Sequence, residues 1–134
     1  IKIPQTGTVF ISVREPDKTK VLVKLARLLI KKGFSIISTE GTSEYLNSHN
    51  IKSSYINKVH QGQPHIVDLI RKGKIDLIIN TTEGKQSIEE SFSIRAEAVI
   101  RDVTYYTSLE ASIATMDAFD YFNMVSVNRL QDYY

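Results

Sequence analysis

Asp76-Leu77-Ile78-Ile79-Asn80 is a run of aliphatic residues between two polar ones, with no alternation of polar and apolar side chains. A strand of this composition is buried on both faces, as strands are in a parallel sheet that helices cover on both sides. The run therefore predicts a central strand of an α/β protein. The remainder of the chain must supply the neighbouring strands and the covering helices.

Strands and helices are predicted to alternate on both sides of this run. The other predicted strands are Thr8–Val13, Phe34–Thr39, Ser54–Ile56 and Val103–Tyr105. The predicted helices, which carry apolar residues at helical spacing, are 17–32, 41–50, 64–73, 87–99 and 108–119. Repeated strand-helix-strand units imply crossover connections. The expected fold is therefore a three-layer α/β/α sandwich around a five-stranded parallel sheet, which is Rossmann-like.

Three local signals predict where helices start. Asp17, which follows the turn at Pro16, is expected to begin the first helix. Pro64 is expected in the first turn of the third helix, where proline is tolerated. Ser87, with Glu90 three residues later, resembles a capping box for the fourth helix.

Composition limits the classes of protein to which the chain can belong. It has 134 residues, with 17 Lys and Arg against 15 Asp and Glu and no Cys. One soluble domain without disulfides, Cys-based zinc sites or thiol nucleophiles is expected, with a cytoplasmic location as the default. Scattered cations argue against nucleic-acid binding, and the apolar runs are too short for a membrane span. The start without Met indicates a piece of a longer polypeptide, with a core over about 7–119 and a tail over 120–134.

Small polar side chains and two lysines follow successive predicted strands. They are Ser12 and Lys18 after the first strand, Thr39, Gly41 and Thr42 after the second, Asn57 and Lys58 after the third, Asn80, Thr81, Thr82 and Gly84 after the fourth, and Thr107 and Ser108 after the fifth. The carboxyl ends of parallel strands share one edge of the sheet, where ligands bind. Hydroxyls, helix N-termini and Lys side chains bind phosphate, so the joint pattern favours a phosphate site. Taken singly, each residue is more often a helix cap or a surface cation.

Residues for catalysis or metal binding do not accompany this pattern. His60 and His65 have no acidic residue between them, and His49 lies in a polar helix end, which argues against a metal site. No adjacent nucleophile or carboxylate completes a catalytic group. Glu89 and Glu90 are expected to complement the dipole at a helix start, as is Glu83. The chain has neither a GxGxxG nor a Walker sequence.

Six motifs, in order along the chain, resemble those of a known family. They are Ser12-Val13-Arg14-Glu15-Pro16-Asp17-Lys18, Gly33-Phe34, Thr39-Glu40-Gly41-Thr42, Asn57-Lys58-Val59-His60-Gln61-Gly62-Gln63-Pro64-His65-Ile66, Gly73-Lys74-Ile75-Asp76 and Ile79-Asn80-Thr81-Thr82-Glu83-Gly84. The chain is similar to the methylglyoxal-synthase-like domain at the C-terminus of the large subunit of bacterial, glutamine-dependent carbamoyl phosphate synthetases. The resemblance implies that an effector phosphate is contacted by Ser12, Lys18, Thr39, Thr42, Lys58, Asn80 and Thr82.

The resemblance also implies a regulatory role. In this family the domain catalyses nothing, needs no cofactor, and binds UMP as inhibitor and IMP as activator. The other domains of the large subunit form a ligase that uses ATP with Mg or Mn, and K. It makes carbamoyl phosphate from bicarbonate and ammonia for pyrimidine and arginine biosynthesis. A separate glutaminase small subunit supplies the ammonia. The other domains and the small subunit are therefore the implied partners.

An ornithine site between this domain and its neighbour is implied as well, with Tyr105 and Thr107 as the contribution of this chain. The chain departs from the family pattern at two positions nearby. Tyr106 stands where an acidic residue is usual, and Glu40 replaces a common His beside the nucleotide site. These differences bear on the response to ornithine and on the choice between pyrimidine and purine nucleotides.

Two other functions remain as alternatives. A free-standing lyase resembling methylglyoxal synthase needs a catalytic carboxylate in the loop before the third helix, but residues 62–65 contain no acid. Its general-acid His is replaced by Arg14 and Thr107. A plain interaction domain, whose strand ends are only helix caps, is the other alternative, and the aromatic tail with Tyr133 and Tyr134 would suit docking.

Overall fold

The computed structural model describes residue 4, residues 6–81 and residues 85–118, with side chains of the helix that begins at residue 85 described from Ile88 onward. Its strands are β1 (Gly7–Ser12), β2 (Phe34–Ser38), β3 (Ser54–Tyr55), β4 (Leu77–Asn80) and β5 (Thr104–Tyr106). They form one sheet in the order β3-β2-β1-β4-β5, and all of these pairings are parallel. The predicted five-stranded parallel sheet is therefore confirmed.

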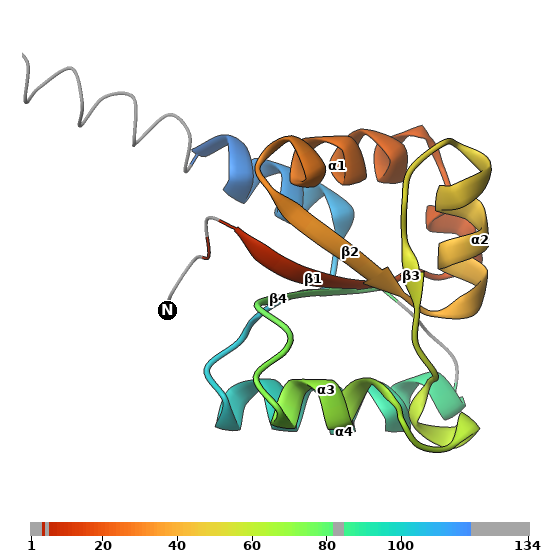
Figure 1. Ribbon diagram of the computed structural model, residues 1–134, viewed down its shortest axis with the longest axis vertical. Coiled ribbons are helices and arrows are strands. Elements are labelled where there is room, and N and C mark those ends of the chain that lie inside the picture. The colour runs from red at the N-terminus through yellow and green to blue at the C-terminus, as the bar shows by residue number, and fades with distance from the viewer. Residues whose placement is uncertain (1–3, 5, 82–84, 119–134) are drawn as a thin grey trace, which may run out of the picture.

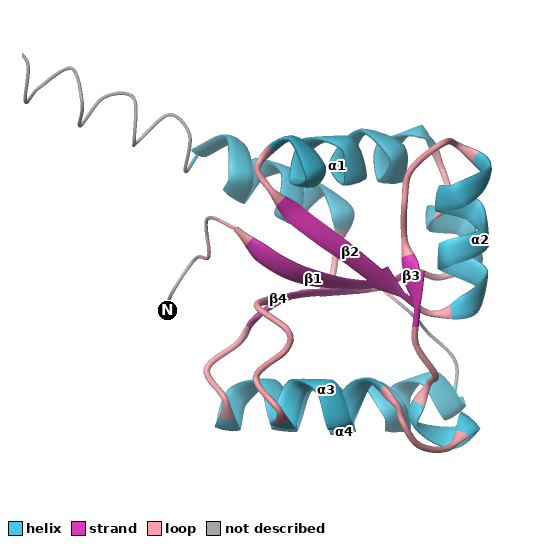
Figure 2. Ribbon diagram, viewed as in Figure 1, coloured by secondary structure: helices cyan, strands magenta, loops and turns pink. Residues whose placement is uncertain are grey.

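The helices cover the sheet in two layers. They are α1 (Lys20–Lys31), α2 (Glu40–Ser48), α3 (Ile66–Arg71) and α4 (Lys85–Ile100), with a further helix over 109–118 and single 3₁₀ turns η1 (Glu15–Asp17) and η2 (Val59–Gln61). Figure 1 shows α1 and the last helix above the sheet and α3 and α4 below it. Figure 2 shows α2 beside the carboxyl ends of the strands, next to β3. This is the predicted three-layer sandwich.

The central strands are buried on both sides because side chains alternate between the two faces of a sheet. Val9 and Leu77, which are partners in neighbouring strands, pack toward α1 and the last helix. Phe10 and Ile78, the next pair, pack toward α3 and α4. All four residues of β4 are buried, as the composition of the 76–80 run predicts. Neither face of β4 meets solvent, in keeping with its place between β1 and β5.

Two predicted helix starts are wrong for local reasons. The first helix begins at Lys20 and not at Asp17, because Thr19 is its N-cap and accepts a hydrogen bond from the N–H of Val21 at 3.2 Å. Asp17 belongs to the separate turn η1. Pro64 lies two residues before α3, whose N-cap is His65.

The capping box predicted at the start of the fourth helix is also wrong. Ser87 lies inside α4, which begins at Lys85. Thr82, Glu83 and Gly84 lie outside the described residues, as does the tail beyond 118. No helix within the described ranges combines the length and the apolar character that crossing a membrane requires.

Candidate functional site

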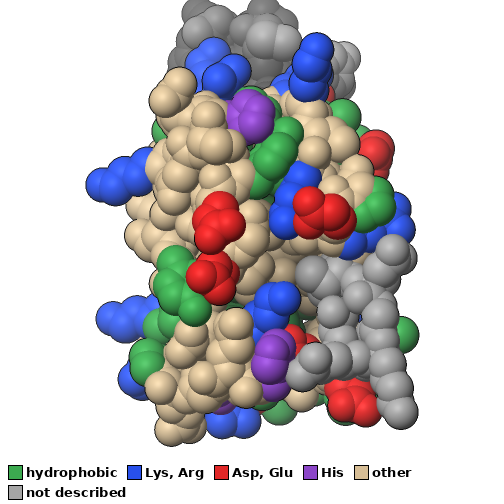
Figure 3. Space-filling model, turned by 90° about the vertical axis from the view of Figure 1, so that its right-hand side faces the viewer, with side chains coloured by type: hydrophobic (Ala, Val, Ile, Leu, Met, Phe, Trp, Pro, Cys, Tyr) green, Lys and Arg blue, Asp and Glu red, His purple; other side chains and the backbone are tan. Residues whose placement is uncertain are grey.

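The strand order places a crevice at the carboxyl ends of β1 and β4. The chain moves outward from β1 to β2 and β3, then returns to the other side of β1 to form β4, so the direction of winding reverses between β1 and β4. Ser12 and Asn80 end these two strands in register, and the N–H of Thr81 donates to the carbonyl of Ser12 at 2.9 Å. Open α/β sheets bind ligands at such a reversal. Figure 3 looks onto this face, where basic, acidic and His side chains stand close together.

Four of the predicted phosphate contacts line one small cavity at this reversal. They are Ser12 from β1, Thr39 after β2, Lys58 before η2 and Asn80 from β4. Phe10, Ile66 and Ile94 form the apolar part of the wall, and Glu90 and Ser91 of α4 complete it. The four predicted contacts, which are separated by up to 68 positions along the chain, therefore meet because the parallel sheet brings its strand ends together.

The hydroxyl groups in this region bond to one another. Ser12 Oγ lies 3.2 Å from Thr39 Oγ1, and the Thr39 hydroxyl donates to Thr42 Oγ1 at 3.4 Å. Thr42 Oγ1 also accepts the N–H of Val13 at 3.2 Å. Thr39 occupies the N-cap position of α2, yet its side chain makes no capping hydrogen bond. An ordinary helix cap therefore does not account for Thr39.

Lys18 lies against the first turn of α2. Its Nζ would be 3.0 Å from a Cβ added at Gly41, so the missing side chain of Gly41 leaves room for the ammonium group. The same Nζ donates to Glu15 Oε2 at 2.7 Å, although the Glu15 side chain is 83% exposed. The Lys18 side chain is only 18% exposed, so its ammonium group is held beside α2 while its present partner Glu15 lies in solvent.

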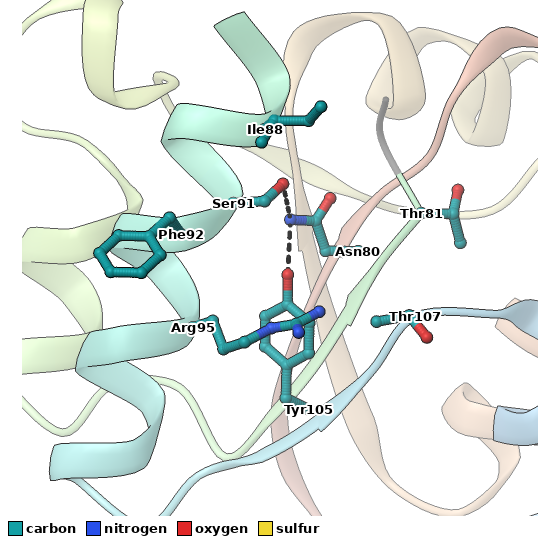
Figure 4. A pocket seen from close by; sticks show the side chains of 8 residues that line it. All are labelled: Asn80, Thr81, Ile88, Ser91, Phe92, Arg95, Tyr105 and Thr107. Carbon is teal, nitrogen blue, oxygen red and sulfur yellow. Dashed lines mark hydrogen bonds between the residues drawn. The ribbon is translucent and has the colours of Figure 1, made fainter. Parts of the chain in front are cut away.

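Asn80 connects the small cavity to a second one. Its Nδ2 donates to Ser91 Oγ at 3.0 Å and to the Tyr105 hydroxyl at 2.9 Å (Figure 4). The second cavity is lined by Asn80, Thr81, Ile88, Ser91, Phe92, Arg95, Tyr105 and Thr107. The structure thus brings the predicted pair Tyr105 and Thr107 to one wall. The guanidinium carbon of Arg95 lies 4.9 Å from the centre of the Tyr105 ring.

Tyr106 takes no part in this second cavity. It is the neighbour of Tyr105 in β5 and therefore faces the other side of the sheet. There it packs against the core beneath α1.

The contact between Glu90 and His60 is absent from the sequence-based prediction. Glu90 Oε1 accepts the N–H of His60 at 3.0 Å and also contacts His60 Nδ1. This contact ties η2, which follows Lys58, to α4. The assumed capping box assigns Glu90 to the helix end, whereas its spacing of four and eight residues from the buried Ile94 and Ala98 indicates an inward position.

The remaining predicted residues are partly accounted for. Lys18 and Thr42 are not among the residues that line the small cavity. Lys18 Nζ lies next to Gly41, and Thr42 is hydrogen-bonded to Thr39, whereas Thr82 lies outside the described residues. The hydroxyl oxygen of Thr81, another of the polar residues that follow β4, accepts a hydrogen bond from the N–H of Arg14 at 3.2 Å. In the part of the chain that the structure describes, no three His, Cys, Asp or Glu side chains are grouped as metal ligands.

Known proteins resemble the chain in sequence and in fold. The MGS-like domain family matches residues 21–107. Carbamoyl phosphate synthase large chains from Xanthomonas campestris and Myxococcus xanthus are 42% and 44% identical over 98% and 99% of the chain, which spans only 12% of their length. A methylglyoxal synthase from Elizabethkingia anophelis shares the fold, with a TM-score of 0.63 and 15% identity over 85% of this chain and 78% of that one. From the family match over most of its length, this chain belongs to the MGS-like domain family.

Proposed function

We propose that the chain is the regulatory domain of a carbamoyl phosphate synthase large chain and binds a nucleoside monophosphate by its phosphate group. The convergence of Ser12, Thr39, Lys58 and Asn80 on one cavity carries this proposal. These residues combine hydroxyl, amide and ammonium donors, which suit a phosphate. The relatives that bear the name of the synthase support the assignment to a larger enzyme.

The phosphate would be held by three kinds of donor. Lys58 supplies a charge from one side, and Lys18 supplies a second after releasing Glu15. The first turn of α2 presents unpaired N–H groups and a partial positive charge next to Thr39. The hydroxyls of Ser12 and Thr39 lie within hydrogen-bond distance of each other, and both would turn from this mutual bond toward the anion when it enters.

Regulation requires that the nucleotide bind two states of the enzyme with different affinities, since equal affinity shifts no equilibrium. Coupling of this kind is typically worth about 1–3 kcal/mol. We propose UMP as inhibitor and IMP as activator, in a cytoplasmic enzyme whose other large-chain domains and glutaminase small subunit perform the synthesis. This segment itself then catalyses no reaction.

We propose that the second cavity is the part of the ornithine site that this chain contributes. Tyr105 and Thr107 line this cavity. Among the described residues of its wall, Arg95 carries a charge and none is a carboxylate. A ligand with ammonium groups needs acidic partners. Ornithine binding therefore requires carboxylates from another part of the enzyme, and the chain alone is expected to bind nucleotides but not ornithine.

Calorimetric titration of the chain with UMP and with IMP tests the proposal. Lys58→Ala is expected to weaken binding of either nucleotide about tenfold or more, because it removes a charge-assisted hydrogen bond to the phosphate. Lys24→Ala, which removes the same charge from the exposed face of α1, should leave the affinity unchanged. Equal affinities of the two variants would contradict the proposed site.

A lyase assay separates regulation from catalysis. The fold is shared with a methylglyoxal synthase, and Glu90 places a carboxylate in the cavity, but this carboxylate is engaged by His60. We expect no release of phosphate from dihydroxyacetone phosphate by the chain. Turnover that is lost in Glu90→Gln would replace the regulatory proposal with the lyase.

A further inference from the structure

The solvent-facing side of α1 carries a line of positive charge that no acidic residue of the helix balances. Its basic residues are Lys20, Lys24, Arg27 and Lys31, and all four are exposed. Every other residue of α1 is aliphatic, so the helix contains no acidic side chain. These four residues are called the basic stripe below.

The basic stripe occupies one narrow side of the helix. Its spacing of four, three and four residues repeats at the period of an α-helix, so the four side chains follow one ridge. From Lys20 to Lys31 this ridge is about 16 Å long, because each residue adds about 1.5 Å. Leu22, Leu25 and Leu29 lie on the opposite side and are completely buried in the core against the sheet. The basic stripe therefore faces outward from the upper layer of the sandwich (Figure 1).

The charges of the basic stripe have no acidic partner within the ranges that the structure describes. Ion pairs there join other cations to acids, as Lys18 is joined to Glu15. Like charges three and four residues apart destabilise a helix, and the stripe consists of such neighbours. Lys20 also lies in the first turn of α1, where the helix dipole disfavours a cation. The basic stripe thus lowers the stability of α1, and a negatively charged partner would offset this effect.

The dimensions of the basic stripe indicate an extended partner. One phosphate or carboxylate pairs with cations within about 4 Å, whereas the stripe is about 16 Å long. Acidic side chains along one face of a second helix could meet all four cations, because both helices have the same rise and period.

Apolar side chains on both sides of the basic stripe favour a protein as this partner. Val21 and Ile30 flank the ridge and are 38% and 41% exposed. Protein interfaces combine apolar contacts with charged residues at the rim. Proteins that bind single-stranded nucleic acids use aromatic side chains on which bases stack, and α1 has none. A helix that binds a membrane surface inserts its apolar face, but the core occupies that face of α1.

We propose that the basic stripe is a docking surface for an acidic helix of another protein, with Val21 and Ile30 providing apolar contacts at its sides. This interaction goes beyond the proposed function and does not depend on nucleotide binding. A second copy of the chain is a poorer partner for this surface, because a two-fold symmetric contact would bring the same positive charges together.

A designed peptide tests the proposal on the complete polypeptide in which the chain occurs. The probe is a helical peptide with four Glu at the same four-three-four spacing and Leu beside them, and its control has Gln in place of every Glu. Fluorescence anisotropy at about 0.1 M salt should give about tenfold or more higher affinity for the Glu peptide. This difference should shrink as added salt screens the charges.

Paired substitutions separate the basic stripe from the net charge of the chain. Lys24→Gln with Arg27→Gln removes two charges of the stripe, and Lys72→Gln with Lys74→Gln removes two exposed charges after α3. Each pair lowers the net charge from +2 to 0. The first pair should weaken binding of the Glu peptide about tenfold or more, and the second should leave it nearly unchanged. Because the first pair removes like-charge contacts within α1, the urea midpoint should not fall, which excludes unfolding as the cause of lost affinity.

Each outcome of these titrations decides the proposal. Equal affinities for the Glu and Gln peptides overturn it, and so do equal losses in the two pairs of variants. A single-stranded RNA and vesicles of phosphatidylglycerol are titrated in parallel. Tighter binding of either one, weakened by the substitutions in the basic stripe alone, would assign this surface to nucleic acid or to a membrane and overturn the proposal as well.

Discussion

At the scale of single residues, Thr39 differs from an ordinary helix cap. Its position before α2 predicts a cap, but its hydroxyl contacts Ser12 and Thr42 and no N–H of the helix. A side chain that serves only the helix would use the nearest unpaired N–H group. The Thr39 hydroxyl instead lies in the wall of the small cavity, where the proposed function assigns it to the phosphate.

Thr39→Val tests the role of this hydroxyl. The replacement keeps the shape of the side chain and removes one donor, so nucleotide binding should weaken about five- to tenfold. Because α2 loses no capping bond, the free energy of unfolding should fall by about 1 kcal/mol or less, through the lost contacts with Ser12 and Thr42. Calorimetry and urea denaturation measure the two quantities. An unchanged affinity would exclude Thr39 from the site.

Gly41 offers a variant in which stability and affinity change in opposite directions. It lies in the first turn of α2, where alanine is favoured over glycine, so Gly41→Ala should stabilise the chain by up to about 1 kcal/mol. The added Cβ would lie 3.0 Å from Lys18 Nζ and must displace that ammonium group. Nucleotide affinity should therefore fall severalfold while the urea midpoint rises. A rise in both would show that Lys18 does not contact the ligand.

At the scale of elements, β5 and α4 meet the site through Asn80. The amide of Asn80 is shared between Ser91 on α4 and Tyr105 on β5. A phosphate that draws this amide toward itself must lengthen or break one of these bonds. Phosphate binding in the small cavity would thereby shift side chains in the wall of the second cavity.

Tyr105→Phe removes the hydrogen bond between the Asn80 amide and the Tyr105 hydroxyl. The variant should change nucleotide affinity by about two- to tenfold, the usual effect of one hydrogen bond. Tyr106→Phe is the matched control, since that neighbouring ring packs on the other face of the sheet. Titration with UMP compares the nucleotide affinities of the two variants. Equal effects of the two substitutions would show that Tyr105 acts only through packing.

The elements also show what the sequence can predict. The strands follow from apolar runs such as 76–80, because burial on both faces leaves a clear composition. Helix starts depend on individual hydrogen bonds, so the helices begin at Lys20 and Ile66, after the N-caps Thr19 and His65, and not at Asp17 and Pro64. For the first helix, composition does not distinguish Asp17 from Thr19, because both are short polar residues that can cap a helix.

At the scale of the whole molecule, the parallel sheet explains why residues far apart in the sequence line one cavity. Carboxyl ends of parallel strands lie at one edge, so residues after different strands are neighbours whatever their separation along the chain. Ser12, Thr39, Lys58 and Asn80 meet for this reason. The Glu90–His60 contact could not be predicted in this way, because it depends on the rotation of α4 about its own axis.

The most direct measurement is a crystal structure of the chain with UMP or IMP bound. The account predicts that the phosphate lies at the carboxyl ends of β1 and β4, with its oxygens about 2.7–3.2 Å from Lys58 Nζ and from the hydroxyls of Ser12 and Thr39. Lys18 should have left Glu15 to face the phosphate. A nucleotide bound elsewhere, or one whose phosphate points to solvent while the cavity keeps its present hydrogen bonds, would contradict the account.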